Sequence, residues 1–174
     1  MSTSEQDAES VDYGSLAEIT RSHLDQMEWV YEEKIVGETI QFQARIGLET
    51  AITRTYIDCA EGSRQVMVFS YAPYKVPENL REAVIEYLTR VNYRLSAPKF
   101  EMDFRDGELR VTVPARFRDA MATLDVLSSM IGQAHNVLDQ YLPGFLMMDY
   151  GHKTAAEAWE SVTGTDASVQ NDSP

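Results

Sequence analysis

The sequence predicts an α+β domain in which helices pack on one face of an antiparallel sheet of about five strands. Three segments between residues 39 and 71 are rich in alternating or β-branched residues and are joined by short links, which is typical of an antiparallel meander. Two further segments, within residues 100–113, flank an Asp-Gly dipeptide that favours a hairpin turn. Helical spacing precedes, separates and follows these strands, so the predicted order is α-β-β-β-α-β-β-α.

The first helix is predicted from the sequence SLAE at residues 15–18. Ser15 can accept a hydrogen bond from the third helical N–H while Glu18 reaches back, which is the capping-box arrangement. Apolar residues then recur at helical spacing until about Trp29. From Thr39 the period changes to two, and strands are predicted at residues 39–46, 51–59 and 64–71.

A second helix is predicted after the three strands, beyond the sequence APYKVP at residues 72–77, which breaks the strand pattern. Pro77 suits a first helical turn, because its φ is already helical and its missing N–H is not needed there. Apolar residues follow at helical spacing, and the helix should end near residues 92–95, before Pro98 disfavours helical backbone. The hairpin of residues 100–113 then returns the chain to the sheet.

Two more helices are predicted in the C-terminal part. Asp119 can cap a long helix with an apolar inner face, which Pro143 and Gly144 should end or kink. The sequence TAAE at residues 154–157 is a second capping box, and it opens a short helix that contains Trp159. Hydrophobic residues make up 44% of the chain, which is enough for a core beneath these helices.

Composition divides the chain into one domain and two tails. Residues 1–12 are small, polar and acidic and are predicted to be disordered; residues 13–162 form a single domain, and residues 163–174 form a second disordered tail. The formal net charge is −13. Such an acidic chain repels phosphate backbones, so nucleic-acid binding is not expected and the charge is interpreted as serving solubility.

The sequence lacks features that mark membrane or secreted proteins. Its longest apolar runs are too short to span a bilayer, and its first ten residues have neither the basic nor the apolar region of a secretory signal. Its one cysteine, Cys59, cannot form an internal disulfide, which suits a reducing compartment. We therefore expect a cytoplasmic protein without membrane contact.

The hairpin FEMDFRDGELRVTV, residues 100–113, raises the question of an active site, because it holds four carboxylates: Glu101, Asp103, Asp106 and Glu108. A two-residue turn at its Asp-Gly pair predicts that Arg105 faces Glu108, Phe104 faces Leu109 and Asp103 faces Arg110. Apolar residues then share one face, and a slip by one residue would expose them. The charged face carries Glu101, Asp103, Arg105, Glu108 and Arg110. Its charges largely neutralise one another, which favours a structural role.

The alternative is that these carboxylates bind a metal ion or a small molecule, as in a hydrolase. Asp103 followed by Glu108-Leu109-Arg110 resembles the core of some metal-dependent nucleases. Such a site needs two carboxylates that converge on one cation, and the predicted pairing of Asp103 with Arg110 argues against it. The chain also lacks histidine pairs at ligand spacing among His23, His135 and His152. We expect no metal and no cofactor.

Two groups of residues are candidates for contact with a partner protein. Tyrosines are enriched at interfaces, and three of them follow the predicted strands: Tyr56, Tyr71 and Tyr74. Met147 and Met148 lie in an apolar run after Pro143-Gly144 and could form a methionine-rich contact surface. Packing on the sheet or in the core remains the alternative for both groups.

Three stretches of the sequence resemble one known family. NYRLSAPKFEMDFRDGELRV at residues 92–111 is preceded by VPENLREAVIEYLTRV and followed by YLPGFLMMDYG. An Asn that closes the second helix, a Phe-Glu-x-Asp strand, an Asp-Gly-Glu hairpin and a Tyr-x-Pro-Gly segment are typical of the YbjN-like family of bacterial proteins. Here these features lie at Asn92 and at residues 100–103, 106–108 and 141–144. Pro98 stands near where the family often has a glycine.

The resemblance implies a curved antiparallel sheet with helices on one side, similar to type III secretion chaperones and often dimeric. It implies no enzyme activity and supplies no catalytic residues, since the family is described as regulators of sensory transduction. We therefore expect a non-enzymatic homodimer that binds another protein in a chaperone-like or regulatory role. An exposed sheet edge or face can accept an extended partner segment through main-chain hydrogen bonds.

Overall fold

Six strands form one antiparallel sheet in the computed structural model, which describes residues 14–117 and 121–167. Their order in the sheet is β1-β2-β3-β4-β6-β5. The strands are β1 (Tyr31–Val36), β2 (Thr39–Gly47), β3 (Ile52–Ala60), β4 (Gln65–Lys75), β5 (Lys99–Met102) and β6 (Glu108–Arg116). The helices are α1 (Leu16–Gln26), the short 3₁₀ helix η1 (Glu78–Leu80), α2 (Arg81–Arg94), α3 (Leu124–Asp149) and α4 (Ala155–Ala167).

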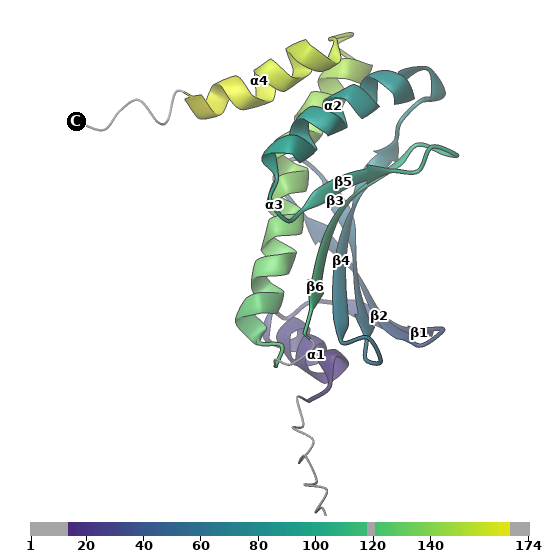
Figure 1. Ribbon diagram of the computed structural model, residues 1–174, viewed down its shortest axis with the longest axis vertical. Coiled ribbons are helices and arrows are strands. Elements are labelled where there is room, and N and C mark those ends of the chain that lie inside the picture. The colour runs from purple at the N-terminus through teal and green to yellow at the C-terminus, as the bar shows by residue number, and fades with distance from the viewer. Residues whose placement is uncertain (1–13, 118–120, 168–174) are drawn as a thin grey trace, which may run out of the picture.

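The α-helices described by the structure lie on one side of the sheet (Figure 1). α3 runs along β4 and β6, α1 packs near one end of α3, and α2 and α4 lie together at the other end. Alternate strand residues such as Val68, Val111 and Val113 meet Leu138 and Leu142 in the core between the two layers. The predicted α+β class, with helices on one face of an antiparallel sheet, is confirmed.

The sheet has one strand more than the five that the sequence predicts. β1 lies at the edge and forms a hairpin with β2 through Gly37-Glu38, where Gly37 adopts a φ of +62°. Apart from half-buried Tyr31, the residues of β1 are exposed. The strand therefore has no buried face, and the alternation that identifies a half-buried strand is missing from its sequence.

β4 is longer than predicted. It runs to Lys75 rather than ending at Tyr71, so the prediction that residues 72–77 break the strand is wrong for most of them. The pairing of β4 with β6 shifts between Tyr71 and Lys75, which marks a bulge, and Pro73 lies inside this interval. A proline is tolerated there because a bulge already interrupts the ladder of hydrogen bonds.

α3 continues through Pro143 and Gly144, so the helix does not end where the sequence suggests. Gly144 is needed for close packing, since a Cβ at this position would lie 2.1 Å from the hydroxyl oxygen of Tyr87. That hydroxyl donates a hydrogen bond to the carbonyl oxygen of Tyr141 at 3.0 Å. The rings of Tyr87 and Phe145 also meet edge to face, with centroids 4.8 Å apart. This buried packing holds the helix together across the proline.

Hydroxyl caps begin α1 and α4 as predicted. The hydroxyl oxygen of Ser15 accepts the N–H of Glu18 at 3.3 Å. Instead of Glu18, the distant Glu61 supplies a carboxylate at this helix start, and it accepts from the Ser15 hydroxyl at 2.7 Å and from the N–H of Ala17 at 3.0 Å. The box at α4 is complete, because the hydroxyl oxygen of Thr154 accepts the N–H of Glu157 at 3.3 Å and the Glu157 carboxylate accepts the N–H of Thr154 at 2.8 Å. The local sequence therefore supplies the hydroxyl cap of both helices, and a tertiary contact from Glu61 completes the start of α1.

α3 and α4 differ from the prediction at their ends. Asp119, the predicted cap of α3, lies outside the described residues, and Thr123 caps the helix through a 3.3 Å hydrogen bond from the N–H of Val126. α4 reaches Ala167, beyond the predicted domain end at residue 162.

Within the described residues, no helix is both long and apolar enough to cross a membrane.

The hairpin of β5 and β6 has a longer turn than the sequence predicts. Met102 pairs with Leu109 and Glu101 pairs with Arg110, so the register differs by two residues from that of a two-residue turn. Phe104, predicted to face Leu109, lies in the turn and is 51% exposed. A shift by two preserves which residues share a face, but it changes which residues are opposite each other.

Local hydrogen bonds explain the longer turn. The carboxylates of Asp103 and Asp106 each accept from the backbone N–H two residues later, at 2.9 and 3.1 Å. Such bonds favour turn conformations over a continued ladder. Gly107 has a φ of +77°, and a Cβ there would lie 2.1 Å from the carbonyl oxygen of Val76. The glycine therefore permits both the turn and the close approach of the chain that leads from β4 to α2.

Candidate functional site

Aromatic and arginine side chains gather on the sheet face that the described helices leave uncovered. Side chains alternate along a strand, so burial of Thr55 and Ile57 on the helix side turns Arg54 and Tyr56 of β3 outward. The two neighbouring strands, β4 and β6, contribute Phe69, Tyr71 and Arg110 to the same face. We call these five residues the outer-face cluster.

Arg110 links three side chains of the outer face and its edge: Phe69, Tyr71 and Glu101. Its Cζ lies 4.5 Å from the centroid of the Phe69 ring, and its Nη1 donates to the hydroxyl oxygen of Tyr71 at 3.1 Å. Its Nε donates to the Glu101 carboxylate at 2.7 Å, and the same carboxylate accepts from the Thr112 hydroxyl at 2.9 Å. Burial acts to lower the pKa of Arg110, but hydrogen bonds to Tyr71 and Glu101 raise it overall. The guanidinium is thus charged and fixed over the ring.

Arg54 repeats this arrangement on the neighbouring strand. Its Cζ lies 5.4 Å from the centroid of the Tyr71 ring, and its Nη2 lies 3.2 Å from the Glu108 carboxylate. The rings of Tyr56 and Tyr71 meet edge to face, with centroids 5.2 Å apart. Together these side chains border a hollow of about 400 Å³, lined by Gln41, Arg54, Tyr56, Asp58, Phe69, Tyr71, Glu108 and Arg110.

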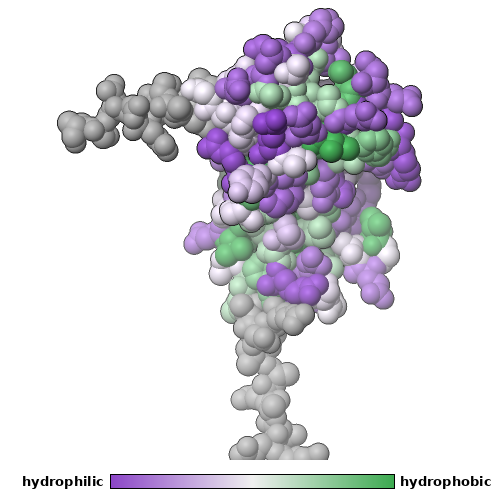
Figure 2. Space-filling model, turned by 45° about the horizontal axis from the view of Figure 1, so that its top comes forward, coloured by the Kyte–Doolittle hydropathy of each residue, from purple (hydrophilic) through white to green (hydrophobic). Residues whose placement is uncertain are grey.

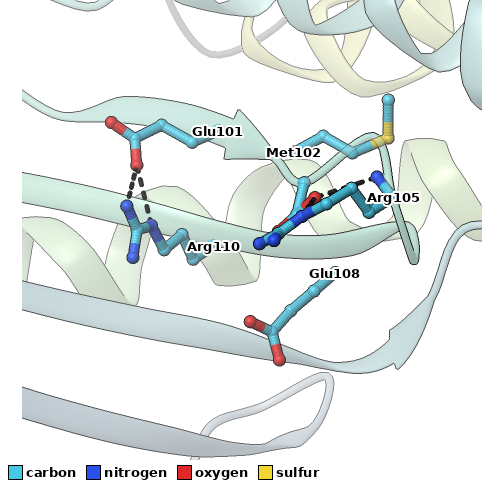
Figure 3. Close-up of a pocket in the computed structure, with 6 residues that line it drawn as sticks. Glu101, Met102, Arg105, Glu108 and Arg110 are labelled. Carbon is cyan, nitrogen blue, oxygen red and sulfur yellow. Dashed lines mark hydrogen bonds and ion pairs between the residues drawn. The ribbon is translucent and has the colours of Figure 1, made fainter.

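A second hollow, of about 390 Å³, adjoins the first at the β5–β6 hairpin. Figure 3 shows Glu101 pointing at Arg110 across the two strands, with Glu108 reaching away from them towards the rest of the sheet. Glu108 and Arg110 line both hollows. The two hollows therefore form one continuous surface across the outer face.

The four hairpin carboxylates each have a cationic partner, namely Glu101–Arg110, Asp103–Arg105, Asp106–Lys75 and Glu108–Arg54. The pairs predicted for Asp103 and Glu108 are wrong, because the register is shifted by two residues. The hydrogen bonds from Arg105 lower the pKa of Asp103 to about 2. Paired in this way, the carboxylates do not converge on one cation as a metal site requires. Over residues 14–117 and 121–167, no group of three His, Cys, Asp or Glu residues could hold a metal ion.

The structure separates the residues that the sequence suggests for partner contact. Tyr56 and Tyr71 belong to the outer-face cluster. Tyr74 packs against the core, and its buried hydroxyl has no hydrogen-bond partner among the described residues. Met147 is half-buried, and Met148 is 2% exposed and forms part of the core, so Met148 cannot reach a partner. Of the five candidates, only Tyr56 and Tyr71 therefore lie on the sheet face that the described helices leave uncovered.

Arg54 and Phe69 are members of the outer-face cluster that the sequence does not single out. Each lies in a strand whose alternation is weak, since Thr and Ser occupy buried positions such as Thr53 and Ser70. These buried hydroxyl groups are 2.9 Å apart and form a hydrogen bond. Because these buried residues are polar, the sequence does not indicate which face of each strand points outward. The cluster also depends on pairing between strands, which the sequence of one strand does not predict.

The fold and this surface define a class of protein with an open antiparallel sheet. In such a protein the described helices cover one face of the sheet, and the other face carries the outer-face cluster. Residues 17–147 match the model of the YbjN family, described as "Putative bacterial sensory transduction regulator". Because the match covers most of the chain, the protein belongs to the YbjN family. The resemblance seen in the sequence is thereby confirmed.

A solved structure supports the fold. The crystal structure of YbjN from E. coli, described as "a putative transcription regulator", is similar with a TM-score of 0.57 and covers 83% of this chain and 98% of that chain. The two sequences are 13% identical, so the similarity shows the fold alone. The comparison with curated proteins found no match. The similarity to type III secretion chaperones stays a prediction.

Proposed function

We propose that this protein is a non-enzymatic cytoplasmic regulator that binds an extended segment of another protein on the outer face of its sheet. The observation that carries the proposal is the outer-face cluster, in which two arginines stack on aromatic rings of an uncovered sheet face. The family is described as regulators rather than as enzymes. A chaperone-like action, in which this surface shields a segment of a client protein, belongs to the same proposal.

The charges of the surface favour a polypeptide over a free anion. Arg54 and Arg110 already pair with glutamates, so they present flat, neutralised planes rather than unpaired positive charge. Tyr and Arg are the residues that most often dominate protein interfaces. Beside them the amide of Gln41 donates to the carboxylate of Asp58 at 2.8 Å, and these polar groups can exchange hydrogen bonds with the main chain of an extended segment.

The test compares two arginines on opposite sides of the molecule that have similar exposure and that each pair with a glutamate. Arg54 pairs with Glu108 and has a side chain 45% exposed, whereas Arg90 on α2 pairs with Glu86 and has a side chain 42% exposed. Proteins captured from a native lysate by the tagged wild type are identified by mass spectrometry. The affinity of the purified partner is then measured by calorimetry for the wild type, Arg54→Ala and Arg90→Ala.

We expect Arg54→Ala to weaken the partner's binding about fivefold or more, because truncation of an arginine at the centre of an interface costs about 1 kcal/mol or more. Arg90→Ala removes the same charge from the helical side and should bind like the wild type. Equal affinities for all three proteins would exclude the outer face. Turnover of a metabolite by the purified protein, without any partner, would contradict the non-enzymatic role.

A further inference from the structure

Next to the outer-face cluster, two arginines lie directly opposite each other on neighbouring strands. Arg45 of β2 pairs with Arg54 of β3 in the register of the sheet. Phe42 and Ala44 are buried on the helix side, so Arg45 points outward as Arg54 does. Like charges that lie opposite each other destabilise a sheet. The stability of the fold therefore does not account for this pair.

The arginine pair belongs to one row of side chains that crosses the outer face. Beyond Arg54, the register continues the row through Tyr71, Arg110 and Glu101. Arg110 and Glu101 form an ion pair at 2.7 Å, so the charges at that end of the row balance. The unbalanced positive charge lies at the other end of the row, at Arg45.

Arg54 is drawn away from Arg45 by its own contacts. Its Nη2 lies 3.2 Å from the Glu108 carboxylate, and its Cζ lies 5.4 Å from the centroid of the Tyr71 ring. Glu108 begins β6 and Tyr71 lies on β4, so both contacts are on the side of β3 that faces away from β2. Glu108 therefore neutralises Arg54 and leaves Arg45 without a counter-charge.

Arg45 forms no ion pair with any residue that the structure describes. The pairing of β1 with β2 ends at Tyr31 and Ala44, so no residue of β1 lies opposite Arg45. Glu32, one step further along β1, pairs with Lys34 at 2.7 Å instead. Because Arg45 is also exposed, its charge is open to a group from another molecule.

Two hollows flank the arginine pair. Arg54 lines the hollow of about 400 Å³ in the outer-face cluster, and Arg45 lines another of about 340 Å³ beside β1 and β2. Together they mark a track for an extended segment across β2 and β3. On the face formed by α2 and α4, by contrast, hydrophobic residues form only small separate patches among hydrophilic ones (Figure 2). That face offers no broad apolar surface that would compete for the segment.

We infer that the client segment carries an aspartate or glutamate whose carboxylate binds between Arg45 and Arg54. A carboxylate has two acceptor oxygens, so it can bond to both guanidinium groups and offset the repulsion between them. The chain as a whole has a formal net charge of −13, so an acidic segment is attracted locally, at this pair. The inference rests on the proposed function, because it names the chemistry of the segment that the outer face binds.

A library of random peptides displayed on phage tests the inference without a known client. Peptides are selected on the immobilised full chain, synthesised and measured by calorimetry. Those whose affinity falls with Arg54→Ala bind the outer face. We expect these peptides to contain an aspartate or glutamate. Its replacement by asparagine or glutamine should weaken binding about fivefold or more, because hydrogen bonds to charged groups are lost.

Two arginines of the outer face supply matched variants of the protein. Arg45→Gln should weaken the same peptides about fivefold or more. This loss should not add to that of the peptide's own substitution, because either change removes the same contact. Arg116 is likewise exposed and without an ion pair to a described residue, and it lies about 20 Å along β6 from Arg110. Arg116→Gln should therefore bind the peptides like the wild type.

Thermal unfolding separates binding from folding in these variants. Arg45→Gln removes one of two like charges, so it should be at least as stable as the wild type. Peptides that bind the outer face without an acidic residue, or that respond equally to Arg45→Gln and Arg116→Gln, would overturn the inference and leave the proposed function in place. If no selected peptide responds to Arg54→Ala, the proposed function itself fails and the inference fails with it.

Discussion

His135 should make the stability of this protein depend on pH, because its imidazole is buried in the folded chain. The residue lies on α3 and is 9% exposed. Its Nε2 lies 2.8 Å from the hydroxyl oxygen of Thr55, and its ring stacks on Trp29 with centroids 5.9 Å apart. Burial lowers the pKa of His135 from 6.5 to about 4, although the charge of nearby Asp139 acts in the opposite direction. The folded protein therefore holds this imidazole neutral.

The sign and size of the effect follow from the difference in pKa. The unfolded chain binds a proton at His135 below pH 6.5, whereas the folded chain binds it only below about pH 4. The stabilising contribution is complete above pH 6.5 and is lost as the pH falls from 6.5 towards 4. A difference of about 2.5 pKa units corresponds to about 3 kcal/mol of unfolding free energy.

Urea unfolding at a series of pH values should reveal this loss when the wild type is compared with His135→Gln. The glutamine can still bond to Thr55 but does not titrate. Other groups titrate in the same interval, among them His23, whose pKa burial also lowers. Their contributions cancel in the difference between the two proteins. We expect the wild type to lose about 3 kcal/mol more than the variant between pH 6.5 and 4.

A proton NMR titration of the imidazole measures the same quantity directly in the folded protein. The signal of His135 should stay that of a neutral ring until the pH approaches 4. If the signal titrates near 6.5, or if wild type and His135→Gln lose stability in parallel, the imidazole is not buried as described and the reasoning fails.

Two glycine substitutions, each with a matched control, should report on close packing. Gly144→Ala should destabilise the protein by about 2 kcal/mol or more, because the new Cβ meets the Tyr87 hydroxyl. Its control is Gly132→Ala, in an open part of the same helix, which should stabilise the protein by about 0.5–1 kcal/mol. Gly107→Ala should cost about 2 kcal/mol or more, since it adds strain at positive φ to a backbone clash, whereas Gly62→Ala meets no atom. Urea unfolding measures all four, and equal effects within either pair would contradict the packing.

Patterns within a short stretch of chain predict most elements of this fold. Helix caps at Ser15 and Thr154 and the alternation of β2 depend on neighbours in the sequence, and the structure has them as expected. β1 is the strand without such a pattern, because both its faces are solvated and it depends on pairing with β2. Pro73 and Pro143 mislead for a related reason. A bulge accommodates the first and core packing accommodates the second, and neither is visible in local sequence.

The β5–β6 hairpin shows why burial is easier to predict than electrostatic pairing. A register shift of two residues leaves Phe100 and Met102 on the inner face, so the predicted apolar face survives. The same shift replaces every opposite residue, and Glu101 rather than Asp103 meets Arg110. The outer-face cluster depends on this register, because Glu101 holds the guanidinium that covers Phe69. Candidate sites built from side chains on several strands are therefore the part that sequence alone predicts least well.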